Sequence, residues 1–277
     1  MESIWHVYSD GTRADIPFDT EEDKVCAWNG IAVSAAVTGV RVLVATVNDT
    51  HLHTMVLGEE NRAERFRQVL QQRLSCIFPD VYLARDPVPT RDEVLSKFMY
   101  VYRNCLDFYR KLPGEYPWGA GHIYFSERRQ FCRGRRIGDL SLREQHRMFR
   151  TRARLPAEWR FDADGRITPE SFIDYEYVEG LFRSVRAFIA FLFVRKEDEA
   201  SMKQEIHRRY LESRTIQDLR RIGNRLSRNL CGHTLVKAPL PIRLKVAVRM
   251  LRDGLSGRSP TLAKALYLQP DDLRLLT

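Results

Sequence analysis

Two histidines on one short segment are the first side chains in this sequence that could do chemistry. His51 and His53 flank Leu52 at the start of a run that alternates like a β-strand. Because side chains alternate between the two faces of a strand, both imidazoles project to one face and can bind one divalent metal ion together. A pair of exposed strand histidines explains the same residues, so the interpretation depends on what surrounds them.

A tyrosine and an asparagine follow on a predicted helix. Thr90 opens a capping box that predicts a helix over residues 90–110. At 100° per residue, Tyr102 lies on the apolar face of this helix, whereas Tyr100 and Asn104 lie one turn apart on the opposite, polar face. We therefore expect Tyr102 to pack in the core. The Tyr100 phenol becomes a candidate nucleophile if its face covers the sheet that bears the histidines.

Four segments, in this order, resemble the signature of single-tyrosine HUH transposases. They are Trp5-His6-Val7-Tyr8-Ser9, residues 48–56 around the histidines, residues 100–106 around the tyrosine, and Glu115-Tyr116-Pro117-Trp118. Within that family, the segments are most similar to the REP-associated tyrosine transposases (RAYTs), which process palindromic repeats in bacterial chromosomes. The resemblance covers the first 125 residues or so and is far more specific than the His-x-His pair.

The resemblance implies a site and a reaction. His51 and His53 correspond to the metal-binding histidines, Tyr100 to the nucleophile, and Asn104 to a third metal ligand. The implied cofactor is Mg²⁺ or Mn²⁺, and the implied partner is single-stranded or hairpin DNA of the REP type. The reaction is then metal-dependent cleavage and strand transfer through a 5′-phosphotyrosine intermediate. Tyrosine suits this role because its phenoxide is both a nucleophile and a fair leaving group.

Three departures from the family pattern leave these side chains in place. Cys105 stands where the family has proline, residues 118–121 read Trp-Gly-Ala-Gly, and residues 48–50 read Asn-Asp-Thr. They indicate a divergent member with altered DNA contacts. Two other functions stay open. One is a catalytically silent, domesticated regulator that binds hairpin DNA on the same scaffold, and the other is an RNA-binding protein with a structural metal site.

An arginine-rich segment follows these motifs. Residues 127–160 contain eleven arginines and four acidic residues, a net charge of +7. Arginines interleaved with aromatic residues are typical of surfaces that contact phosphates and stack on bases. We expect this segment to be a DNA-binding bridge rather than a solvated linker. The arginines expected to contact DNA are Arg128, Arg129, Arg133, Arg135 and Arg136.

The patterns before residue 90 predict the elements that position these side chains. Strands are predicted at residues 4–9, 41–47, 51–57 and 81–84, and helices at residues 19–39 and 61–78. Asp19 is the expected cap of the first helix. The order β-α-β-β-α-β is that of a split βαβ, ferredoxin-like antiparallel sheet. We therefore predict the α+β class, with a tyrosine-bearing helix after the sheet and an all-α C-terminal region.

Residues 161–277 show almost only helical signals. Amphipathic patterns predict helices at residues 171–193 and 215–230. Residues 258–273 resemble a helix-turn-helix whose second helix is short, and a simple packing pair of helices fits them equally well. The expected parts are a catalytic domain at 1–126, the bridge at 127–160 and a helical domain at 161–277.

Composition places the chain among globular proteins that meet polyanions. It has 277 residues, with 45 Lys and Arg against 36 Asp and Glu, a net charge of +9 that favours a nucleic-acid partner. No apolar run reaches the roughly 20 residues of a membrane span, and no signal peptide begins the chain. We therefore expect a cytoplasmic, nucleoid-associated bacterial protein without a membrane partner. Monomer and homodimer both stay open, and five scattered cysteines argue against a disulfide framework.

Overall fold

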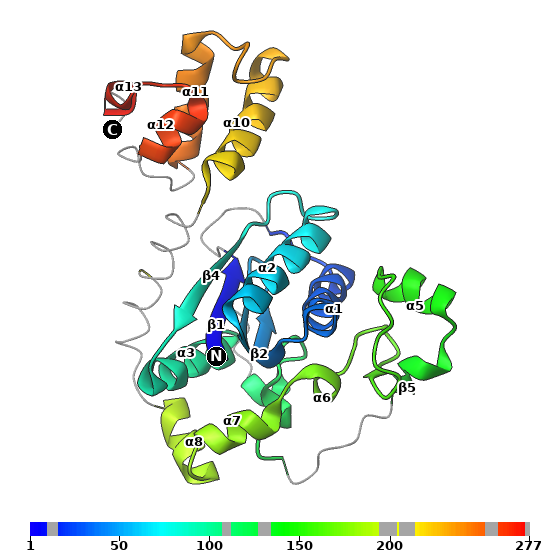
Figure 1. Ribbon diagram of the computed structural model, residues 1–277. Coiled ribbons are helices and arrows are strands. Elements are labelled where there is room, and N and C mark those ends of the chain that lie inside the picture. The colour runs from blue at the N-terminus through cyan, green and yellow to red at the C-terminus, as the bar shows by residue number, and fades with distance from the viewer. Residues whose placement is uncertain are drawn as a thin grey trace. The chain divides into compact units, whose positions relative to one another are not determined.

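Two compact units make up the chain. The computed structural model describes residues 1–9, 16–106, 112–126, 134–193, 204, 214–252 and 260–274. The first unit, Met1–Lys203, contains a four-stranded antiparallel sheet, and the second, Gln204–Thr277, is helical (Figure 1). The sheet order is β2 (Arg41–Val47), β3 (Leu52–Gly58), β1 (Ser3–Ser9) and β4 (Leu83–Val88). This order confirms the predicted α+β class and the ferredoxin-like arrangement of the strands.

Two local features of this domain differ from the prediction. Helix α1 (Glu21–Thr38) is capped by Thr20 rather than by Asp19, because the Thr20 hydroxyl accepts the Asp23 N–H at 3.1 Å. Strand β4 runs through Pro87, whereas the prediction ended it at residue 84. Since β4 is an edge strand of this sheet, the missing N–H of Pro87 interrupts no inner ladder.

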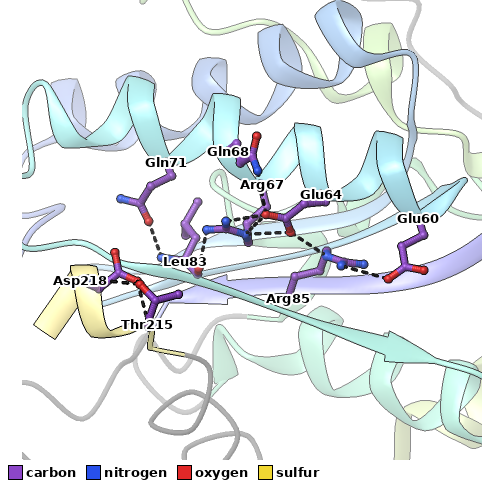
Figure 2. A network of polar contacts seen from close by, with 9 residues as sticks. All are labelled: Glu60, Glu64, Arg67, Gln68, Gln71, Leu83, Arg85, Thr215 and Asp218. Atoms are coloured by element: carbon purple, nitrogen blue, oxygen red, sulfur yellow. Dashed lines mark hydrogen bonds and ion pairs between the residues drawn. The ribbon is translucent and has the colours of Figure 1, made fainter. Parts of the chain in front are cut away.

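Helix α2 (Glu60–Ser75) is held to β4 by a polar network (Figure 2). Glu64 accepts hydrogen bonds from Arg67 on its own helix, at 2.6 Å, and from Arg85 Nε on β4, at 3.1 Å. Because Arg85 and Asp86 point to opposite faces of the strand, α2 covers the face of the sheet away from Asp86. Helix α1 packs beside α2.

The third helix, α3 (Arg91–Arg103), covers the other face. Thr46 Oγ1 on β2 donates to the Val101 carbonyl at 2.9 Å and fixes the helix over the sheet. The helix ends at Arg103, earlier than predicted, because the Asn104 N–H bonds to the Val101 carbonyl three residues back rather than to the carbonyl four residues back. Residues 107–111 lie outside the described part of the chain.

In its described part, the basic bridge is a folded module. Strand β5 (Arg135–Arg136) pairs with β6 (Arg160–Phe161), and η3 (Ile137–Asp139) and α5 (Leu142–Phe149) lie between them. A buried apolar core joins these elements and is formed by Ile137, Leu140, Phe149, Leu155 and Phe161. A solvated linker has no such core, so that alternative does not hold for residues 134–160.

Residues 161–193 belong to the first unit and pack with its sheet and with α1. Trp28 Nε1 donates to the Ile167 carbonyl at 2.7 Å, and Arg41 pairs with Asp174 at 2.9 Å. The single helix predicted here is divided into α6 (Pro169–Phe172), α7 (Tyr175–Leu181) and α8 (Val185–Phe193). The boundary between the compact units therefore lies at residues 203–204, later than the expected residue 161.

The second unit is a small bundle with its own apolar core. Its helices are α10 (Ile216–Cys231), α11 (Leu240–Arg252), α12 (Pro260–Leu266) and α13 (Pro270–Arg274). Thr215 caps α10 through a box with Asp218, which Figure 2 also shows. Tyr267, between α12 and α13, adopts a left-handed φ of 56°, as a turn between two helices requires. Among the described residues, no helix is long and apolar enough to cross a membrane.

Candidate active site

The face of the sheet beneath α3 carries a cluster of polar and aromatic side chains. Strand register places Tyr8 of β1 and Thr46 of β2 on either side of His53 on β3. His6 precedes Tyr8 by two residues and therefore shares this face. The rings of His51 and His53 lie 4.8 Å apart, as expected for two histidines on one face. All five side chains are buried, because α3 lies over them.

Asn104 meets His51 at the end of α3. Its Oδ1 lies 2.8 Å from His51 Nε2 and also accepts a hydrogen bond from Asn48 Nδ2. The other ring nitrogen of His51, Nδ1, lies 2.8 Å from the Thr50 hydroxyl. The fold therefore brings together His51 and Asn104, two of the residues predicted to bind a metal, at the C-terminal end of α3.

His53 is held by a second buried imidazole. His53 Nδ1 lies 3.1 Å from His6 Nε2, and the two rings stack with centroids 5.1 Å apart. Burial lowers the pKa of His6 well below its usual value, and the positive charge of Lys97 lowers it further. His6 is therefore a neutral imidazole at neutral pH.

The two neighbouring tyrosines of α3 have different surroundings. The Tyr100 ring meets the His53 ring edge-on, with centroids 5.3 Å apart. Tyr102 points the other way, packs among Phe98, Tyr124 and Phe188, and donates its hydroxyl to the Gly121 carbonyl at 3.2 Å. Burial raises the pKa of Tyr102 to about 12. The helix-face prediction is confirmed for Tyr102, but Tyr100 is buried, because its polar face lies against the sheet.

The segment after α3 supports the same end of the sheet. Trp118 accepts the Val47 N–H at 2.9 Å, and the Tyr116 hydroxyl donates to the Val47 carbonyl at 2.7 Å. The turns η1 (Pro113–Glu115) and η2 (Gly121–Ile123) flank these contacts. The Tyr-Pro-Trp landmark thus fixes the chain immediately before Asn48.

The donor atoms at His51 and Asn104 suit a divalent cation. Two ligands about 2.1 Å from one metal at a right angle lie about 3 Å apart, close to the 2.8 Å between His51 Nε2 and Asn104 Oδ1. Asn48 Oδ1 is buried without a hydrogen-bond partner. A half-turn of the Asn48 amide would bring this oxygen toward the same two atoms, an arrangement that a cation stabilises. Amide oxygens suit hard cations such as Mg²⁺ and Mn²⁺, whereas imidazole nitrogens also suit Zn²⁺ and other transition metals.

A site of this kind relies on amide oxygens. Among the described residues, no group of three or more His, Cys, Asp or Glu side chains is placed to hold a metal ion. The sequence-based interpretation missed Asn48 and His6. The alternation of His6 with Tyr8 in the first strand was an available signal, whereas Asn48 lies in a turn without any periodic pattern.

The predicted DNA-binding arginines are only partly described. Arg135 and Arg136 are exposed on β5, on the surface of the bridge module. The other three, Arg128, Arg129 and Arg133, lie outside the described residues. Their proposed contacts with DNA remain predictions.

Comparison with known proteins found one partial likeness of fold to report. No protein-family model matches the chain, and no curated protein matches it. Among solved structures, the chain is similar to one described as the REP-associated tyrosine transposase bound to a REP hairpin. That similarity covers 43% of this chain and 77% of the other chain, at 10% identity and a TM-score of 0.35.

Proposed function

We propose that this protein is a metal-dependent single-strand DNA endonuclease and strand transferase that uses Tyr100 as its nucleophile. The observation that carries the proposal is the convergence of His51, His53, Asn104 and Tyr100 on one buried cluster. His51 directly precedes β3 and His53 lies on it, whereas Tyr100 lies on α3 and Asn104 directly follows that helix. Residues so distant in the sequence come together only in the folded chain. Their types and order match the HUH signature to which the sequence is similar.

In this proposal, His51, His53 and Asn104 would hold Mg²⁺ or Mn²⁺, and Asn48 would contribute its amide oxygen. The bound cation would neutralise charge on the scissile phosphate and orient it for in-line attack. Thr50 holds Nδ1 of His51, which directs Nε2 of that ring toward Asn104. His6 would act in the same way on His53, because its Nε2 lies 3.1 Å from His53 Nδ1 and would leave the other ring nitrogen of His53 for the cation.

Tyr100 supplies the covalent step. Its Oη forms a bond to phosphorus as the bond from phosphorus to the 3′ oxygen breaks. The phenol loses its proton, and the departing oxygen gains one to become a 3′-hydroxyl. The product is a 5′-phosphotyrosine, which a 3′-hydroxyl can later reverse. Because Tyr100 is 6% exposed, part of the surrounding chain has to move aside before DNA reaches it.

Hairpin DNA of the REP type is the proposed substrate. The bridge module presents Arg135 and Arg136 on its surface, and the neighbouring Arg128, Arg129 and Arg133 continue the basic sequence. Cations on such a surface attract the phosphate backbone without reading its sequence.

A covalent-trapping experiment tests this function. The full-length protein is incubated with pooled single-stranded hairpins and Mn²⁺, denatured, and any DNA attached to the protein is sequenced. We expect attachment that depends on Mn²⁺ and maps by mass spectrometry to Tyr100. Tight hairpin binding without attachment in any pool would instead support the catalytically silent regulator. Attachment at another tyrosine would exclude the proposed nucleophile.

A further inference from the structure

The C-terminal unit carries the whole excess positive charge of the chain. Gln204–Thr277 contains 15 Lys and Arg and 6 Asp and Glu, a net charge of +9 that equals the total for all 277 residues. Met1–Lys203 is left with 30 basic and 30 acidic residues and a net charge of zero. The positive charge of the basic bridge is therefore balanced by acidic residues of the same unit, whereas the C-terminal unit keeps an excess of positive charge.

Helix α10 concentrates this charge on one side. Its core side is defined by the buried residues Leu219, Gly223 and Ser227. At 100° per residue, Arg221, Arg225 and Arg228 fall within about 60° of one another on the opposite side. Arg221 and Arg228 are exposed and Arg225 is half-buried. We call these three residues the α10 stripe.

Helix α11 repeats the same pattern. Its buried residues are Val246, Ala247 and Met250. Lys245, Arg249 and Arg252 lie opposite them, at the same spacing of four and then three residues, and all three are exposed. We call them the α11 stripe. Each stripe spans eight residues, a rise of about 10 Å along the helix, which is the rise of about three nucleotides along one DNA strand.

Helix stability does not explain the stripes. Like charges four residues apart on a helix repel one another and destabilise it. Within the described part of this unit, two of the acidic side chains cap helices: Asp218 bonds to Thr215, and Asp272 accepts the Gln269 N–H. The phosphates of a bound polyanion would lower the repulsion between cations four residues apart.

The chemistry of the unit favours duplex DNA over other polyanions. Proteins that bind single strands stack bases on aromatic side chains, and the described residues 214–252 and 260–274 contain one tyrosine, Tyr267, which lies under Arg220, one histidine, His233, and no Phe or Trp. A membrane-binding helix exposes its apolar face, but here the apolar faces of α10 and α11 form the unit's core. Binding to the backbone of duplex DNA needs contacts with phosphates, but neither base stacking nor insertion of apolar side chains.

We propose that the C-terminal unit binds the phosphate backbone of duplex DNA through the α10 and α11 stripes, without reading base sequence. The unit is thus a second DNA-binding surface that uses neither Tyr100 nor the metal. It goes beyond the proposed function because it assigns a different form of DNA to a different unit.

Duplex binding by the full-length protein tests this inference. Affinity for a 20-base-pair duplex without hairpins is titrated against salt in EDTA, so that no cleavage contributes. The test variants are R221Q/R225Q/R228Q and K245Q/R249Q/R252Q. The matched control, R62Q/R65Q/R186Q, removes three exposed arginines from the neutral unit. We expect each stripe variant to bind about 10- to 100-fold more weakly near 0.1 M salt, with a log–log salt slope flatter by about 2–3. The control should change affinity by less than about threefold.

Further arms separate a surface role from misfolding and from other ligands. R221K/R225K/R228K keeps the charge, so it should keep wild-type affinity within a few-fold, and circular dichroism checks the helices. Equal losses in the control and the stripe variants would overturn the inference, as would unchanged duplex binding. The inference would also be overturned if the stripe variants lost affinity only for phosphatidylserine vesicles or only for a single-stranded 20-mer, and kept their affinity for the duplex. Failure of covalent trapping would leave these measurements untouched, so the two proposals can fail separately.

Discussion

The two compact units use polar residues in opposite ways. In Met1–Lys203, opposite charges are equal in number, and a set of polar groups is buried between the sheet and α3. In Gln204–Thr277, the core is apolar and the two arginine and lysine stripes lie outside it. Buried polar groups are costly unless they bond to one another, so a cluster that survives inside a fold is fixed in geometry. Cationic side chains on the surface keep their conformational freedom. They therefore suit a partner whose negative charges repeat along its length, such as a polyanion.

This difference separates chemistry from long-range attraction. Fixed geometry is what a nucleophile and a metal site require, because small displacements cost large factors in rate. Attraction to a polyanion depends on the number of cations rather than on their exact placement. Single side chains should therefore matter most in the first unit, whereas sets of side chains should matter in the second.

The largest effect should come from one atom in the first unit. Tyr100→Phe should reduce covalent attachment of hairpin DNA at least about 1000-fold, because it removes the attacking oxygen, while the hairpin Kd should change less than about twofold. Denaturing gels and fluorescence anisotropy measure the two quantities. Tyr102→Phe is the matched control on the same helix and should keep attachment. Loss of attachment in that control alone would reverse the assignment of the two tyrosines.

A smaller effect is expected from the residue that holds His53. His6→Phe keeps a ring in the stack but removes the nitrogen that lies 3.1 Å from His53 Nδ1. We expect Mn²⁺ affinity, measured by electron paramagnetic resonance titration, to fall about 10- to 100-fold. Tyr8→Phe removes a hydroxyl that donates to Asp86 on the same sheet face, so it is a control that should change Mn²⁺ affinity little. Equal losses in both variants would mean that His6 acts only through packing.

The bridge module tests whether the neutral unit also contacts DNA. Replacing Arg133, Arg135 and Arg136 with alanine should weaken binding to different hairpins about equally, by roughly tenfold. The salt slope for hairpins should flatten by about 2–3, since fewer counterions are released. A salt titration of hairpin affinity measures both. Unchanged affinity and slope would assign hairpin binding to other parts of the chain and would sharpen the contrast between the units.

A packing defect in the second unit should destabilise that unit without changing metal binding in the first unit. A Cβ on Gly223 would lie 2.7 Å from Leu235 Cδ1 and 2.8 Å from Leu266 Cδ2, so Gly223→Ala forces buried side chains to shift. We expect a net destabilisation of about 1–2 kcal/mol after the gain in helix propensity, and unchanged Mn²⁺ affinity. Hydrogen exchange, measured separately for each unit, gives the change in the free energy of unfolding. Gly180→Ala, where a Cβ meets nothing within 4 Å, is the control. Loss of protection in both units would show that they unfold together.

The smallest effect concerns the second tyrosine of α3 at high pH. The pKa of Tyr102 is about 12 when folded against about 10 when unfolded, so its contribution is complete below pH 10 and is lost as pH rises toward 12. The stability advantage of wild type over Tyr102→Phe should therefore be about 1.4 kcal/mol smaller at pH 11 than at pH 9. Urea unfolding at both pH values measures it. A constant difference would mean that Tyr102 ionises normally in the fold.

Local periodicity in the sequence determined the elements and the faces of the first unit. Alternation placed His51 and His53 on one side of a strand, and helical spacing separated Tyr100 from Tyr102, because both patterns follow from backbone geometry over a few residues. The same local rules predicted the start of α10, where Thr215 and Asp218 form a capping box. The sequence also determined the charge of each unit, once the boundary between them was known.

Only the tertiary structure decided which distant side chains meet. Strand register brings His6 to His53, and the end of α3 brings Asn104 to His51 and Asn48, over separations of about 50 residues. No periodic pattern encodes register, since a strand shifted by two residues keeps the same faces. The folded bridge and the boundary at 203–204 likewise depend on contacts such as that of Trp28 with Ile167, 139 residues later. Such contacts form because burial removes apolar surface from water, and burial is a property of the whole fold rather than of any short segment.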